Sequence, residues 1–183
     1  MTRFPKTLAA LAASAALLAA PALAQDNPTV GGAPMMADMN IVENAVNSPI
    51  HTTLVAAVQA AGLVETLQSE GPFTVFAPTD DAFAALPDGT VETLLQEENR
   101  GQLTKVLTAH VVPGRLTSSD LLGMAGSGTA DLTTVSGDAL SVGLRGGAPV
   151  VYDESGNVYA ISIADVMQSN GVIHVVDGVL LPQ

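Results

Sequence analysis

The spacing of apolar residues changes part-way along this 183-residue chain. Up to about residue 110, apolar side chains mostly recur at intervals of three and four, the spacing of one face of a helix. From about residue 139 they alternate with small or polar residues, as Leu140, Val142 and Leu144 do, which predicts strands. Helices in one half of a chain and strands in the other favour an α+β domain with an antiparallel sheet.

Capping and breaking residues set the bounds of the expected elements. Ser48 and Pro49 predict a helix start, because serine caps free amides and proline is favoured in the first turn, and this helix would run to Gly62. Further helices are expected at residues 63–68, 80–86, 91–96, 100–108 and 118–122. Strands are expected at residues 73–77, 139–144, 150–152, 158–163 and 172–177, with a hairpin turn at 153–157.

The first 24 residues have the composition of a secretory leader. Arg3 and Lys6 precede an Ala/Leu run, and Ala22-Leu23-Ala24 has the small-x-small form of a cleavage site. The apolar run covers about 13 residues, whereas a membrane-spanning helix needs about 20. We therefore predict a signal peptide over residues 1–24, a flexible Pro- and Gly-rich linker over 25–38 and one domain over 39–183.

Charge and cysteine content exclude several classes of protein. The chain has no cysteine, so it can form no disulfide scaffold, thiolate nucleophile or cysteine-ligated metal site, and packing must hold the fold. Its formal net charge of −12 would become −14 if Arg3 and Lys6 left with the leader. Six scattered basic residues cannot form the positive surface that phosphate backbones require, so we expect no nucleic-acid partner.

Catalytic and metal-binding patterns are weak in this sequence. It has no Gly-x-Ser-x-Gly elbow, and His51, His110 and His174 do not have metal-ligand spacing. Residues 153–157 are similar to a calcium loop, but the glycine comes too early and the distal glutamate is missing, which favours a hairpin. We expect no enzyme, cofactor or metal. A serine hydrolase is a remote alternative, because catalytic triads assemble in space.

Three segments together resemble the fasciclin (FAS1) domain family. Residues 71–83 (GPFTVFAPTDDAF) resemble its first signature block, residues 170–177 (NGVIHVVD) its second, and His110-Val111-Val112-Pro113-Gly114 its histidine segment. The resemblance spans about Met39 to Gln183. It implies a wedge-shaped β-sandwich with a helical bundle in the N-terminal half, of a kind found in secreted and surface adhesion proteins.

One residue departs from the family pattern. Ala109 stands where the resemblance implies a tyrosine before the histidine. The Tyr-His segment of animal relatives is implicated in integrin-mediated attachment, so without the tyrosine that activity is not expected here.

Seven residues of these segments are candidates for an interaction surface or for signature roles in the fold. Structural roles are the simpler interpretation: a cap for Thr79, a hydrogen-bonded core histidine for His110, either a buried hydrogen-bonded or a half-exposed histidine for His174, and a turn for Asp177. The full set is Thr79, Asp80, His110, Val111, Val112, His174 and Asp177.

The predicted function is that of an exported, non-enzymatic module that mediates adhesion by binding a cell-surface protein or polysaccharide. We expect a monomer without a membrane anchor, in the periplasm or outside the cell. The alternative is a carrier of a small apolar ligand, because a chain that is 48% hydrophobic but only 3% aromatic can leave its interior loosely filled.

Overall fold

A computed structural model describes residues 27–87 and 89–182 of the chain. The predicted signal peptide, residues 1–24, and the first two residues of the predicted linker lie outside this part. Within these two ranges, no helix has the length and apolar character needed to cross a membrane.

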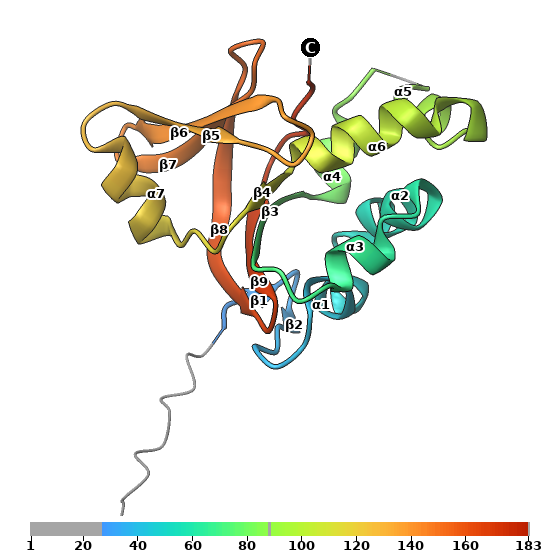
Figure 1. The fold of residues 1–183 in the computed structure, drawn as a ribbon, viewed down its shortest axis with the longest axis horizontal. Coiled ribbons are helices and arrows are strands. Elements are labelled where there is room, and N and C mark those ends of the chain that lie inside the picture. The colour runs from blue at the N-terminus through green and yellow to red at the C-terminus, as the bar shows by residue number, and fades with distance from the viewer. Residues whose placement is uncertain (1–26, 88, 183) are drawn as a thin grey trace, which may run out of the picture.

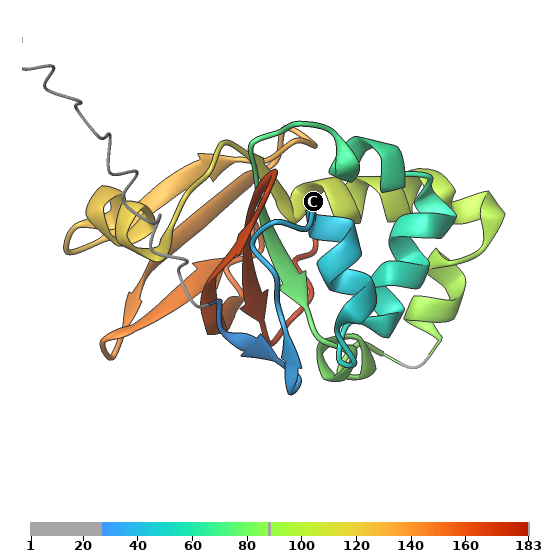
Figure 2. The ribbon, with the colours of Figure 1, turned by 90° about the horizontal axis from the view of Figure 1, so that it is seen from below.

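Most of the helices gather on one side of the central strands, whereas the last one lies apart on the other side (Figures 1 and 2). Among the helices on the first side, α2 and α6 pack against each other. In the described ranges the helices are α1 (Ile41–Asn47), α2 (Thr52–Ala61), α3 (Val64–Gln68), α4 (Asp80–Ala84), α5 (Thr90–Leu94), the 3₁₀ helix η1 (Glu97–Asn99), α6 (Arg100–Ala109) and α7 (Ser118–Ala125).

Seven strands form one sheet in the order β4-β3-β9-β8-β7-β6-β5, and β1 and β2 form a small separate hairpin. The pair β3 and β9, second and third in this order, is parallel, and the other neighbours are antiparallel, so the predicted antiparallel sheet is in fact mixed. The strands are β1 (Thr29–Val30), β2 (Ala33–Pro34), β3 (Phe73–Pro78), β4 (Val111–Pro113), β5 (Thr129–Thr133), β6 (Ala139–Arg145), β7 (Ala148–Tyr152), β8 (Val158–Gln168) and β9 (Gly171–Val176).

The parallel pair of strands separates two hydrophobic cores. In β3, Val75 and Ala77 pack into the core on the helix side, while Phe76 packs into the core inside the curled sheet. In β9, Val175 faces the helices and Val176 the sheet interior. Because successive side chains of a strand point to opposite faces, both strands need apolar residues at nearly every position.

The long sheet curls until its two ends approach each other. The N–H of Val135, just after β5, donates to the carbonyl of Val111 in β4, with a distance of 2.8 Å between the two atoms. The inner core therefore lies between two halves of one continuous sheet, which correspond to the two layers of the expected sandwich. The predicted α+β class is confirmed.

The N-terminal segment is packed from residue 27 onward, although the sequence analysis predicts a flexible linker to residue 38. Val30 is only 2% exposed and Met35 only 6%, and both belong to the helix-side core. The Asn27 side chain accepts from the N–H of Met167 at 2.9 Å and donates to its carbonyl at 2.6 Å. The Met36 backbone is also held by the Asn44 side chain, so the linker prediction is wrong for residues 27–36.

The predicted helix start at Ser48 and Pro49 is also wrong. A separate helix, α1, precedes these residues and begins with a capping box formed by Asn40 and Glu43, and Ser48 is its C-cap. The next helix, α2, begins at Thr52 after the N-cap residue His51. Ser48 and Pro49 thus lie in the turn between α1 and α2.

The remaining predicted elements agree with the structure to within a few residues, although α7 and β8 run further than expected. The sequence analysis does not predict β5. Of its five residues only Leu132 is buried, so the apolar alternation that reveals a strand is missing.

Candidate functional site

The polar residues of the first signature block join the starts of two helices. Thr79 is the N-cap of α4, and its hydroxyl accepts from the N–H of Ala82 at 3.2 Å. The Asp80 carboxylate reaches across to α2, where it accepts from the N–H groups of Thr52 and Thr53 at 3.2 and 2.8 Å. Asp80 therefore supplies the cap that His51 does not provide for α2.

These contacts also change the acidity of Asp80. Partial burial alone would raise its pKa, but the hydrogen bonds from Thr53 and Thr52 outweigh that effect and hold the pKa below the ordinary value of 3.8. The carboxylate is therefore charged at neutral pH, which suits the positive end of the α2 dipole.

We expect Thr79→Ala to lower the free energy of unfolding by about 1 kcal/mol, because it removes the cap of α4. The matched control, Thr79→Ser, keeps the hydroxyl and should lose much less. Urea unfolding of the three proteins measures the difference. Equal stability of Thr79→Ala and the unaltered protein would show that the cap contributes nothing.

His110 is a buried histidine with both ring nitrogens in use. It is 2% exposed at the end of α6, where Nδ1 donates to the Val106 carbonyl at 2.8 Å and Nε2 accepts from the N–H of Leu180 at 2.9 Å. These partners fix the neutral form, because a second ring proton would meet the Leu180 donor. Burial lowers the pKa of His110 to about 4, although the Val106 carbonyl opposes the shift.

His174, inside the curled sheet, is likewise a buried histidine with both ring nitrogens hydrogen-bonded. Its side chain is fully buried and stacks on Phe76, with 5.6 Å between the ring centroids. Nδ1 accepts from the N–H of Asp165 at 3.3 Å, and Nε2 donates to the carbonyl of Leu116 at 2.8 Å. Burial lowers its pKa, with smaller opposing effects from Leu116 and Asp165. His110 is thus the hydrogen-bonded core histidine that was predicted, and of the two alternatives left open for His174 the structure shows the buried, hydrogen-bonded one.

The other candidates of the histidine segment and second block also serve the packing. Val111 and Val112 are buried on opposite faces of β4, one in each core. Asp177 is exposed, and its carboxylate accepts from the N–H of Ala160 at 2.7 Å, which ties the end of β9 to β8. The adjacent Gly178 lies so close to the Tyr159 ring that a Cβ atom there would overlap it.

The seven candidates are not brought together in one site. Their side-chain hydrogen bonds go to other residues and never join two of the seven. Thr79 and Asp80 act together at the starts of α4 and α2, the two histidines and Asp177 brace other junctions, and Val111 and Val112 pack in the two cores.

One serine, Ser48, contacts a histidine, and another, Ser118, contacts an aspartate next to a histidine, but neither arrangement is that of a catalytic triad. Ser48 Oγ lies 2.7 Å from His51 Nδ1, yet both residues are 3% exposed and no carboxylate orients the ring through Nε2. Ser118 Oγ donates directly to the Asp165 carboxylate, and His174 contacts only the backbone N–H of Asp165. A triad needs the base between the serine and the acid. Within the described ranges, no group of three or more His, Asp or Glu could hold a metal ion.

Asn170 is an organising residue that the sequence analysis does not single out. Its side-chain oxygen accepts from the N–H of Ile41 at 3.0 Å, at the start of α1. Its amide nitrogen donates to the carbonyls of Leu67 and Ser69 at 2.7 and 2.9 Å, at the end of α3. The residue thus joins two helices to β9, and its place in an Asn-Gly turn was the sequence signal.

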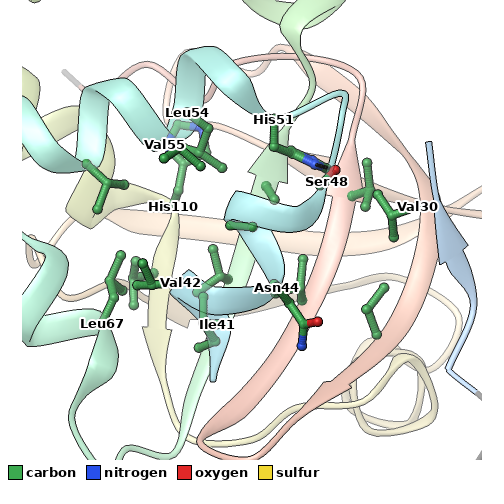
Figure 3. Close-up of a pocket in the computed structure, with 18 of the residues that line it drawn as sticks. Val30, Ile41, Val42, Asn44, Ser48, His51, Leu54, Val55, Leu67 and His110 are labelled. Carbon is green, nitrogen blue, oxygen red and sulfur yellow. Dashed lines mark hydrogen bonds between the residues drawn. The ribbon is translucent and has the colours of Figure 1, made fainter. Parts of the chain in front are cut away.

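A cavity of about 50 Å³ lies on the helix side of β3 and β9. Figure 3 shows Leu54, Val55 and His51 along one side of this space and Ile41 and Val42 along another. Seventeen of the 22 lining residues are apolar, and the helices α1, α2 and α3 supply about half of the lining.

A model of the Fasciclin domain matches residues 49–182 of the chain. The chain belongs to the fasciclin family. Protein sll1483 of Synechocystis sp. is 50% identical over 144 residues, which cover 79% of this chain and 74% of that protein. A second relative from the same organism, uncharacterized protein sll1735, is 46% identical over 78% of this chain and 97% of its own length.

More distant relatives of this fasciclin domain are larger proteins. Transforming growth factor-beta-induced protein ig-h3 of Sus scrofa is 40% identical over 70% of this chain, which spans only 17% of that protein. The solved FAS1 domain pair from the insect cell adhesion molecule Fasciclin I matches with a TM-score of 0.70 at 21% identity, over 78% of this chain and 51% of that chain. This likeness confirms the FAS1-type fold.

The residue that departs from the family pattern lies in the interior of this fasciclin domain. Ala109 is 4% exposed and adjoins a cavity of about 10 Å³ beside Leu180 and Leu181. That volume is close to the minimum for one water molecule, so the position has no room for a larger group without rearrangement.

Proposed function

We propose that this fasciclin domain is exported and acts as a non-enzymatic interaction module that binds a cell-surface protein or polysaccharide. The observation that carries the proposal is the Fasciclin match over residues 49–182, together with the shared fold of Fasciclin I, a cell adhesion molecule. Export is supported by the leader pattern of residues 1–24.

In the part of the chain that the structure describes, the lack of a catalytic triad supports an interaction role. Ser48 and His51 are buried in the interior, Ser118 pairs with the half-buried Asp165 instead of a histidine, and most polar signature residues bond to backbone groups at helix and strand ends. Such residues stabilise a scaffold, and contact with a partner is left to the exposed surface.

The charge of the surface limits the chemistry of the partner. Two of the four basic residues outside the predicted leader have partners within the domain: Lys105 lies 3.7 Å from the Asp138 carboxylate, and Arg115 donates to the Gln168 carbonyl at 3.1 Å. The predicted mature charge of −14 repels acidic polymers at long range. A neutral or basic surface group is therefore the better partner.

We expect attachment to an acidic polysaccharide to strengthen as salt rises from about 10 to 150 mM, because the screening length falls from about 30 to about 8 Å. Binding of the purified protein to an immobilised acidic polymer across this range measures the effect. Attachment that weakens steadily with salt would show that a local basic patch, and not the net charge, controls the contact.

The test of the proposed function is attachment of residues 25–183 to intact producing cells and to their purified exopolysaccharide. We expect saturable, concentration-dependent binding to at least one of them. An unrelated protein of similar size and negative charge is the control for non-specific adsorption. Absence of saturable binding to cells, exopolysaccharide and host surfaces would overturn the proposal.

A further inference from the structure

The cavity on the helix side has an uncharged wall. Its 22 lining residues include no Asp, Glu, Lys or Arg. Burying a charge in such a place is costly unless a partner neutralises it, so the wall disfavours ions. Val42 and Val55 are half-buried and Gln59 is exposed, so the cavity reaches towards the surface between α1 and α2.

All but one of the buried polar side chains in the wall already have their hydrogen bonds. Asn44 bonds to the backbone of Met36 and to the side chain of Gln168, and both nitrogens of His110 are in use. Ser48 bonds to Nδ1 of His51. These groups therefore have little capacity to hold water or a polar ligand.

The exception is Nε2 of His51. In the described ranges it is the one buried side-chain nitrogen or oxygen without a hydrogen-bond partner, and the residue is 3% exposed. An unpaired buried polar atom destabilises the folded state, so a group that pairs with it would be bound favourably. Burial lowers the pKa of His51. A contact of the ring with the Ala77 backbone, which does not have the geometry of a hydrogen bond to Nε2, and the Asp80 charge oppose this shift more weakly, so the ring is neutral at pH 7.

The lack of free polar partners, and not the size of the cavity, argues against water as its occupant. A water molecule needs roughly 10–15 Å³ and two to four polar partners, whereas this cavity has about 50 Å³ and one unpaired polar atom. An apolar cavity with one unpaired polar atom suits a small, mainly apolar molecule that carries one polar group.

We propose that the cavity binds a neutral, mainly apolar small molecule that enters between α1 and α2 and makes one hydrogen bond with His51 Nε2. A hydroxyl suits this position, because it can donate or accept and therefore pairs with either tautomer that Ser48 permits. This binding site goes beyond the surface interaction proposed above and does not depend on it.

The test uses a series of linear alcohols, from methanol to 1-pentanol, added to the purified protein and followed by NMR. We expect saturable shifts of the cavity methyl groups and of the His51 Nε2 resonance. Affinity should rise about fourfold per added CH₂ and stop rising near 1-propanol, because a cavity of about 50 Å³ has room for only about four heavy atoms. Propanoate, which is charged at pH 7, should not bind.

Two phenylalanine variants locate the site. Ala45 lines the cavity from α1 and is half-buried, so Ala45→Phe should fill the space and abolish 1-propanol binding. Ala60 is exposed on α2 outside the lining, so Ala60→Phe is the matched control and should bind as the unaltered protein does. The absence of saturable shifts, unchanged binding in Ala45→Phe or an unmoved His51 Nε2 resonance would each overturn the proposal.

Discussion

Replacing Phe76 with alanine should lower the free energy of unfolding by about 3–5 kcal/mol, the usual cost of deleting a fully buried ring. Phe76 is 0% exposed, belongs to the core inside the sheet and stacks on His174. Both neighbours of β3 hold the strand in place, so the structure has little freedom to collapse into the space left by the ring. A loss of this size removes much of the 5–15 kcal/mol by which domains are normally stable.

Phe73→Ala is the matched control for this prediction. Phe73 lies at the start of the same strand but is only half-buried, so its removal should destabilise the domain less. Urea unfolding followed by circular dichroism gives both free energies. A loss below about 1 kcal/mol for Phe76→Ala would show that the ring is not part of the core.

Acidification from pH 7 to pH 4 should destabilise the domain by about 3 kcal/mol through His110 alone. In the unfolded chain this ring takes up a proton near its ordinary pKa of 6.5, but in the folded chain it stays neutral until about pH 4. The unfolded state therefore binds more protons in this window, and stability falls as the pH falls. His51 and His174, whose pKa values are also lowered by burial, act in the same direction.

Urea midpoints at pH 7, 6, 5 and 4 test the acid prediction. His110→Gln removes the titrating ring, so its stability should change less with pH than that of the unaltered protein. The Asp80 and Asp120 carboxylates, whose pKa values lie below 3.8, would add their effect only at lower pH. Constant stability between pH 7 and pH 4 would contradict the burial of neutral histidines.

The sequence predicts the elements whose local signals and tertiary roles agree. Strand β3 lies between breaking residues and is rich in aromatic and β-branched side chains, and Thr79 has the preferred chemistry of an N-cap. The burial of His110 follows from its place on the apolar face of α6, because the C-terminal turn of that helix packs into the core.

The sequence does not predict elements that tertiary contacts hold in place. Residues 27–36 have no apolar period, and they are fixed by the burial of Val30 and Met35 and by the hydrogen bonds of Asn27 to β8. The parallel pairing of β3 with β9 joins strands nearly 100 residues apart, which periodicity cannot reveal. Asn40 and Glu43 form a capping box, which is a sequence signal for the start of α1. Ser48 and Pro49, which come later in the chain, favoured a helix start after α1 instead.

The candidate site also has features that the sequence predicts and features that it does not. Composition suggested a loosely filled interior, but the position of the cavity and the unpaired nitrogen of His51 depend on how α1 and α2 pack over the sheet. Conversely, the seven signature residues were evident from sequence, and the structure places most of them in packing or capping contacts.

The central claim is that the signature residues build the scaffold and that exposed surface makes the contact with a partner. Attachment of His110→Gln to producing cells, compared with that of the unaltered protein at a temperature where both are fully folded, tests this claim most directly. Because His110 is 2% exposed, we predict equal binding constants within twofold. A fully folded His110→Gln protein that no longer attaches would contradict the claim and assign the histidine segment to recognition.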